Sequence, residues 1–166
     1  MRRVEDIHSR RFASNPAAVG GQLETLSQPD DDFWVTDLVP PMVLDNGLQP
    51  GSVGGHGAVR YSVIEHEPGR SVVFRFDQRT GLRGTHRFVI EQDGDDIIVR
   101  HELEAELSGA MRLLWKPLVL PIHSGVIEDI FDHLERSAGH EPNRQHPTRA
   151  PMRWIARRMA ALETRG

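Results

Sequence analysis

The sequence of 166 residues contains no cysteine, and this absence excludes several kinds of site. Disulfide bonds, thiolate metal sites and cysteine nucleophiles all require a thiol. Long apolar runs are also missing. No stretch approaches the roughly 20 apolar residues of a membrane-spanning helix, and no apolar run follows the charged N-terminus. We therefore expect a cytoplasmic protein without a secretory signal or a transmembrane segment.

An excess of basic residues is lacking too, because the formal net charge is -4. Proteins bind nucleic-acid phosphates through a basic surface, and this chain is slightly acidic, so we expect no nucleic-acid partner. The chain has no Gly-x-Ser-x-Gly elbow, and no Lys-Ser/Thr follows the glycines at 51–57. An α/β-hydrolase and a phosphate-binding loop are thereby excluded. The 38% of hydrophobic residues is typical of one globular domain.

Alternating apolar and polar residues predict an antiparallel meander in the centre of the chain. Four strands are expected, at about 59–64, 72–77, 82–91 and 96–107. The last of them has one charged face and one apolar face, so one side of the sheet must be covered. Residues 4–12 are expected to add an edge strand.

Two short helices are predicted before this sheet. The first begins with Asn15-Pro16, where asparagine caps the helix and proline fits the first turn. Gly20 and Gly21 weaken it, because glycine is a poor helix former. The second is expected to begin at Pro29, with the acidic residues 30–32 at the positive end of its dipole.

A long helix is predicted after the sheet, with apolar residues at helical spacing from Ile122 to Leu134. Pro117 and Pro121 should kink this helix or delay its start, because proline removes a backbone hydrogen bond. The solvent face is predicted to consist of Glu128, Asp132, Glu135 and Arg136.

These elements predict an α+β fold in which a curved antiparallel sheet wraps around the long helix. Residues 1–138 are expected to form this domain, and residues 139–166 a linker and a short amphipathic helix. The apolar face of that helix is predicted to consist of Met152, Ile155, Met159 and Leu162. We expect it to fold back on its own domain or on its twin in a homodimer.

Several short motifs accompany this order of elements. They are Gly54-Gly55-His56-Gly57-Ala58-Val59-Arg60-Tyr61, Gly81-Leu82-Arg83-Gly84-Thr85-His86, Arg100-His101, Trp115, Pro121-Ile122-His123 and Glu128-Asp129. Residues 4–138 resemble a bacterial branch of the START/Bet v 1-like superfamily, also called the polyketide cyclase/dehydrase and lipid-transport superfamily. The resemblance implies a helix-grip fold with a cavity between sheet and long helix. It implies no single reaction, because members include lipid carriers, aromatase/cyclases and small-molecule sensors.

Three histidines lie on faces that are otherwise apolar: His86, His101 and His123. The first two are in phase with apolar residues of adjacent strands, and the long helix should bring His123 over them. Imidazole titrates near neutral pH, so the three would serve as general acid and base for cyclisation, dehydration or hydrolysis of a bound carbonyl compound. The alternative is that each is a buried residue with a structural hydrogen bond.

Zinc is another use for three histidines. The chain has no His-x-His or His-x-x-x-His pair, however, so we expect no metal and no cofactor.

Other residues are expected to hold the ligand, with an arginine and a tyrosine for an oxyanion or a carbonyl. The predicted ligand-binding residues are Arg60, Tyr61, Phe74, Phe76, Phe88, Leu103, Trp115, Ile127 and Phe131. Three hypotheses stay open. The protein binds a small hydrophobic or aromatic molecule, lipid- or polyketide-like; or it is a cyclase/dehydratase or hydrolase-type enzyme; or it is an interaction protein with a filled core.

Overall fold

The computed structural model of the chain describes residues 2–146, 148 and 150–163, with side chains up to Ala161. Within this part of the chain, seven strands form one antiparallel sheet in the order β1-β7-β6-β5-β4-β3-β2. The strands are β1 (Arg2–Ala13), β2 (Val43–Leu44), β3 (Val53–His56), β4 (Val59–Glu67), β5 (Ser71–Phe76), β6 (Leu82–Asp93) and β7 (Asp96–Leu107). The helices are α1 (Pro16–Glu24), α2 (Met111–Leu114), α3 (Leu120–Ser137) and α4 (Ala150–Glu163), with a 3-10 turn (Gln78–Thr80) and a π-helical turn (Trp115–Val119).

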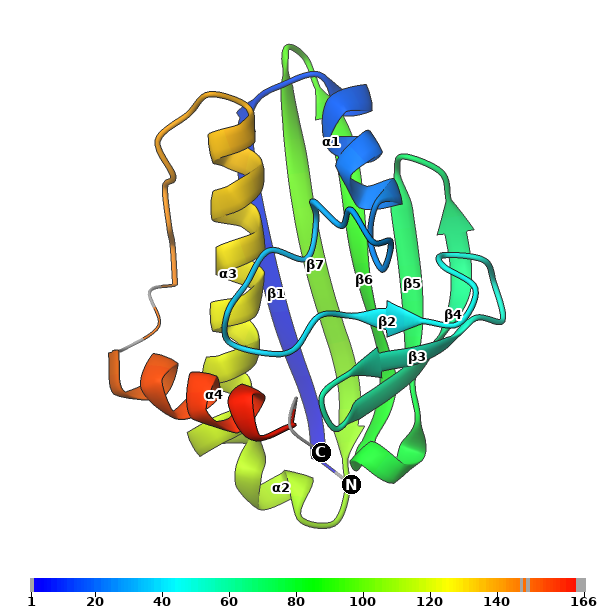
Figure 1. Cartoon of the computed structure of the whole chain (residues 1–166), viewed down its shortest axis with the longest axis vertical. Helices are drawn as coiled ribbons and strands as arrows, with labels where there is room; N and C mark the ends of the chain where they lie inside the picture. The colour runs from blue at the N-terminus through cyan, green and yellow to red at the C-terminus, as the bar shows by residue number, and fades with distance from the viewer. Residues whose placement is uncertain (1, 147, 149, 164–166) are drawn as a thin grey trace.

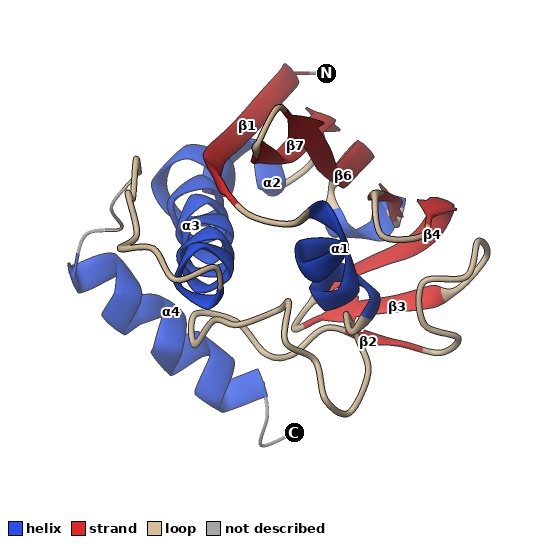
Figure 2. Ribbon diagram, turned by 90° about the horizontal axis from the view of Figure 1, so that it is seen from above, coloured by secondary structure: helices blue, strands red, loops and turns tan. Residues whose placement is uncertain are grey.

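The sheet curves around the helices, as predicted. Figure 1 shows α3 running alongside β1 at one edge, with α4 lying across its lower part. Seen from above, the sheet bends from β1 round to β2 and β3, and α1 lies inside the curve (Figure 2). The predicted α+β fold is therefore confirmed. None of the described helices has both the length and the apolar character needed to cross a membrane.

Alternation along β7 sets the inside and outside of the sheet. Val99, His101 and Leu103 are buried with at most 1% of their surface exposed. On the other face, Glu102 forms an ion pair with Arg87 of the neighbouring strand β6. Such cross-strand pairs are expected on the solvent-exposed face of a sheet. The covered face predicted from the sequence is the one that faces the helices.

The two prolines delay the long helix, as predicted. Pro117 lies in the π-helical turn, and Pro121 lies in the first turn of α3. Proline has no backbone N–H to donate, and its ring crowds the preceding turn, which a wider π-helical turn relieves. After β7 the chain therefore forms α2 first, and α3 begins only at Leu120.

The predicted helix at Pro29 is wrong, so α1 is the only described helix between β1 and β2. The carboxylate of Asp31 accepts hydrogen bonds from the backbone N–H groups of Ser27, Phe33 and Trp34 at 2.8–2.9 Å. Aspartate competes in this way with helical backbone bonding, and it folds the segment into turns. The strand β3 (Val53–His56) was not predicted, because its sequence is rich in glycine.

Three of the four residues predicted on the solvent face of α3 are buried: Glu128, Asp132 and Glu135. The prediction was wrong because two distant segments cover this face. Arg10 of β1 reaches all three carboxylates, and the backbone of residues 143–145 donates to two of them. A charged helix face can be buried when its partners are charged and well placed.

Gly20 and Gly21 of α1 make a matched pair for a stability test. A Cβ on Gly20 would lie 2.4 Å from the carbonyl oxygen of Gly69, whereas one on Gly21 would have no neighbour within 4 Å. We expect Gly21→Ala to raise the free energy of unfolding by about 0.5–1 kcal/mol and Gly20→Ala to lower it by about 1–3 kcal/mol. Urea denaturation measures both, and equal effects would contradict this packing of α1.

Candidate functional site

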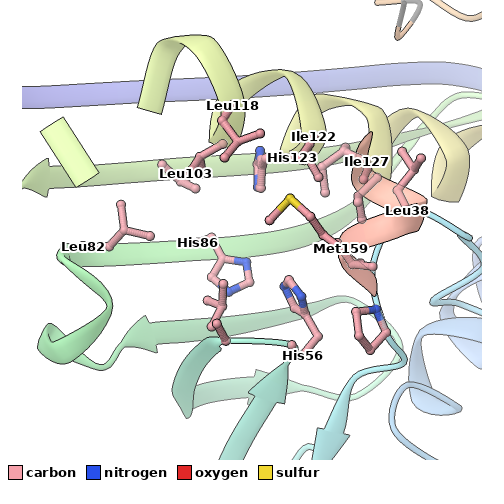
Figure 3. Close-up of a pocket in the computed structure, with 18 of the residues that line it drawn as sticks. Leu38, His56, Leu82, His86, Leu103, Leu118, Ile122, His123, Ile127 and Met159 are labelled. Carbon is pink, nitrogen blue, oxygen red and sulfur yellow. The ribbon is translucent and has the colours of Figure 1, made fainter. Parts of the chain in front are cut away.

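A cavity of about 270 Å³ lies between the sheet, the start of α3 and the helix α4. Its walls are mostly apolar, with Leu103 from β7 and Ile122 and Ile127 from α3 pointing into the space (Figure 3). The helix α4 completes the wall with Ala156, Met159 and Ala160. The C-terminal helix therefore folds back on its own domain, which is one of the two predicted arrangements, and covers the cavity.

The structure brings the three predicted histidines to this cavity, where His86, His101 and His123 all line the wall. Five of the predicted ligand-binding residues also line it: Tyr61, Phe76, Leu103, Trp115 and Ile127. The sheet and the long helix supply them together, so the cavity lies where the resemblance implied.

The other four predicted ligand-binding residues do not line the cavity. Phe74, Phe88 and Phe131 are fully buried core residues. Arg60 is exposed, and its guanidinium donates to the carbonyl oxygens of Gly57 and Val59. Alternation gives the face of a strand on which a side chain lies, but not its depth in the core.

His86 and His101 form a buried pair of imidazoles. Nδ1 of His86 and Nε2 of His101 lie 3.3 Å apart. Burial lowers the pKa of both well below the usual value, so both rings are neutral at pH 7. One of these nitrogens donates to the other. Among the described atoms, Nε2 of His86 and Nδ1 of His101 have no partner, so the pair presents one free donor and one free acceptor.

His123 is held by a carboxylate that the sequence analysis did not identify. Nδ1 of His123 lies 2.6 Å from Oδ2 of Asp6. Burial alone would raise the pKa of Asp6, but hydrogen bonds from His123 and His8 outweigh it and hold that pKa well below its usual range. An ionised carboxylate only accepts, so Nδ1 of His123 carries a proton. The ring lines the cavity, and Nε2 is the nitrogen that does not contact Asp6.

A fourth imidazole, His56 of β3, lines the same cavity. Its ring centre lies 5.0 Å from that of Trp34 and 5.9 Å from that of Tyr61. Burial, and then repulsion from His123, lowers the pKa of His56 to about 3, so this ring is neutral at pH 7. The Gly-Gly-His-Gly motif marks a close backbone approach, because a Cβ on Gly54 or Gly55 would lie 2.0 Å from the carbonyl oxygen of Val43 or Val59.

Behind the cavity wall, His8 joins two carboxylates. Nε2 of His8 lies 3.2 Å from Asp6, and Nδ1 lies 3.0 Å from Glu128. Burial alone would lower the pKa of His8, but these hydrogen bonds outweigh it and raise the pKa to about 9. His8 is therefore an imidazolium at pH 7 and donates through both nitrogens. Alternation of residues 4–12 places Asp6 and His8 on one face of β1, which was the available signal.

The three neutral imidazoles make stability depend on pH in a defined direction. The folded-state pKa of His56, His86 and His101 lies below that of the unfolded chain, so the unfolded chain binds more protons below about pH 6.5. The free energy of unfolding is therefore not reduced by these three histidines above pH 6.5, and it decreases as the pH falls below that value. We expect a loss of about 1 kcal/mol per histidine between pH 6.5 and pH 5.5.

Urea denaturation at these two pH values measures this loss. His8, whose pKa is raised, is protonated in both states below about pH 6 and adds little to the slope there. His56→Phe should reduce the loss by one histidine's share. An unchanged stability between the two pH values would contradict neutral buried imidazoles.

The sequence matches no model of a protein family, and no curated protein is significantly similar to it. Solved structures are similar in fold. CalU16 from Micromonospora echinospora is 13% identical with a TM-score of 0.58, over 97% of this chain and 86% of that one. Major latex-like protein 151 from Panax ginseng is 13% identical with a TM-score of 0.60, over 82% and 97%. Norcoclaurine synthase from Thalictrum flavum is 9% identical with a TM-score of 0.58, also over 82% and 97%. With this sheet, this long helix and these neighbours, the chain has the START/Bet v 1-like fold.

Proposed function

We propose that the protein binds one small, mainly apolar molecule with a polar group in the cavity between sheet and α3. The observation that carries the proposal is the composition of the cavity lining: most of its side chains are apolar, but three of its residues carry buried polar atoms without a described partner. Those described atoms are Nε2 of His86, Nδ1 of His101 and the hydroxyl of Tyr61. A buried polar group without a hydrogen bond costs about 1–3 kcal/mol, and a ligand that supplies the missing bonds removes this cost.

The size of the cavity limits the ligand. A cavity of about 150 Å³ in another protein binds benzene, and this one measures about 270 Å³. A two-ring aromatic compound or a short lipid therefore fits better than a long-chain lipid. The ligand should bear a hydroxyl or carbonyl group, because the free ends of the His86–His101 pair offer one donor and one acceptor.

Native mass spectrometry and thermal-shift screening test the proposal, with 2-naphthol, naphthalene, a short fatty acid and an isoprenoid alcohol as probes. A ligand that binds only the folded state raises the melting temperature. We expect 2-naphthol to bind at least about tenfold more tightly than naphthalene, which lacks the hydroxyl. Equal affinity for the two would contradict the role of the polar atoms, and binding of no probe would favour the filled core.

Tyr61→Phe separates a ligand contact from a core residue. The hydroxyl of Tyr61 is buried with no described partner, so its removal should leave the free energy of unfolding unchanged or slightly higher. We expect the affinity for 2-naphthol to fall about fivefold to tenfold. Calorimetric titration and urea denaturation measure the two effects. A destabilised variant with unchanged affinity would place Tyr61 in the core alone.

The pairing of His123 with Asp6 favours a second candidate, an enzyme of the cyclase, dehydratase or hydrolase kind. Asp6 binds Nδ1 of His123, and Nε2 of this cavity-lining ring would then act as the general base. If bound carbonyl compounds are converted, His123→Gln should abolish turnover. Asp6→Asn should lower kcat more than it lowers affinity, and a loss of affinity without a change in kcat would exclude a base at His123.

A cytoplasmic location, a homodimer and the division into residues 1–138 and 139–166 stay predictions.

A further inference from the structure

We propose that His8, Glu128 and His146 form a binding site for one divalent ion of the zinc type, outside the cavity. One ligand atom from each residue lies within 4.8 Å of the others. None of the three lines the cavity. The proposal therefore stands or falls independently of any ligand in the cavity.

The distances are close to those of a metal site. Nδ1 of His8 and Oε1 of Glu128 lie 3.0 Å apart, and the ring centres of His8 and His146 lie 4.9 Å apart. Tetrahedral zinc, with bonds of about 2.0–2.2 Å, holds its ligand atoms about 3.3 Å apart. The separation of His8 and Glu128 is within a few tenths of an ångström of this value, but the ion would take the place of the Nδ1 proton, so the carboxylate of Glu128 must turn off the line of that hydrogen bond. Exposed His146 must turn toward the same point.

The two buried ligands are already oriented by other groups. Oδ1 of Asp6 binds Nε2 of His8 and thereby directs Nδ1 at Glu128. The second oxygen of Glu128 accepts from Arg10 at 2.7 Å and from the backbone of Gln145 at 3.0 Å. A carboxylate behind a ligating histidine and a hydrogen-bonded ligating carboxylate are the supports that protein metal sites use.

The third ligand is brought to the site by the chain itself. Because the backbone of Gln145 donates to Glu128, the next residue, His146, lies beside both buried ligands. Three segments far apart in sequence, namely β1, α3 and the segment after α3, each supply one ligand. An ion here would fasten the segment that leads to α4, the helix that covers the cavity.

The donor set selects the class of ion. Two imidazoles and one carboxylate suit zinc, with a fourth position for water, whereas calcium and magnesium prefer oxygen ligands alone. Binding releases the Nδ1 proton of His8 to solvent, and the ion's charge then faces the carboxylates of Asp6 and Glu128. The divalent ion thus replaces the single positive charge of the His8 imidazolium between the carboxylates of Asp6 and Glu128, and the positive charge there increases.

Calorimetric titration of the full chain, free of any tag and stripped with chelator, with zinc chloride tests the proposal. We expect one zinc per chain, and cobalt(II) bound at the same site should show visible absorption of a tetrahedral centre. His146→Ala should weaken zinc binding at least about tenfold. Because His146 is exposed, this variant should fold normally.

His140→Ala is the matched control, since His140 is an exposed imidazole of the same segment that binds the carbonyl oxygen of Ala13. It should bind zinc as the unchanged protein does. The proposal is overturned if zinc at about 100 µM does not saturate the chain, or if His146→Ala and His140→Ala bind zinc equally well.

Discussion

Replacing Arg10 by methionine is expected to lower the free energy of unfolding by about 3–5 kcal/mol. Only 2% of the surface of Arg10 is exposed. Its guanidinium donates to Asp132 at 3.1 Å and to Glu128 and Glu135 at 2.7 Å each. Methionine would leave three buried carboxylates without this counter-charge, which costs much more than the loss of a surface ion pair.

Arg11→Met is the matched control, because it changes the next residue of the same strand. The side chain of Arg11 is 56% exposed and pairs with Asp93 and Asp96 at the surface. An exposed ion pair contributes about 0–1 kcal/mol, so the control should be close to neutral. Urea denaturation gives both values. If the two variants lost the same stability, Arg10 would not join β1 to α3 in the way described.

Ile122→Trp is expected to lower the affinity for 2-naphthol about 100-fold or more, because the indole would occupy the space that the ligand needs. Ile122 points into the cavity from α3 (Figure 3). Filling an existing cavity adds apolar contacts, so the melting temperature of the ligand-free protein should stay the same or rise. Titration calorimetry and thermal denaturation measure the two effects.

Leu113→Trp provides the comparison, because Leu113 lies on α2 with 79% of its surface exposed and does not line the cavity. This variant adds the same indole and should leave the affinity unchanged. If both variants weakened binding equally, or if neither did, the ligand would bind somewhere other than the cavity.

The sheet and the long helix were predictable because their signals are local. Alternation along 82–91 and 96–107 predicted β6 and β7, two of the three longest strands, and it put His86 and His101 on the same face. The register differs slightly from a direct opposition, since His86 pairs with Leu103, and His101 pairs with Phe88. Helical spacing then brought His123 over this face. Each of these inferences needed only neighbouring residues.

The parts that failed depend on contacts between distant segments. Glu128 looks like a solvent-exposed residue of an amphipathic helix, and only the approach of Arg10 and His8 from β1 makes its burial possible. Alternation along β1 gives only the face on which Asp6 lies and not its role, because its partner His123 comes from α3. At Asp31, local hydrogen bonds to the backbone overrode the charge pattern that favoured a helix start.

The most direct test of the cavity and its polar atoms is long-range ¹H–¹⁵N NMR of the histidine side chains, with and without 2-naphthol. We expect His86 and His101 to be neutral at pH 7 and still neutral at pH 6. We also expect saturating 2-naphthol to shift the signals of Nε2 of His86 or Nδ1 of His101. Rings that titrate near pH 6.5, or nitrogen signals that do not move when the ligand is bound, would contradict these expectations.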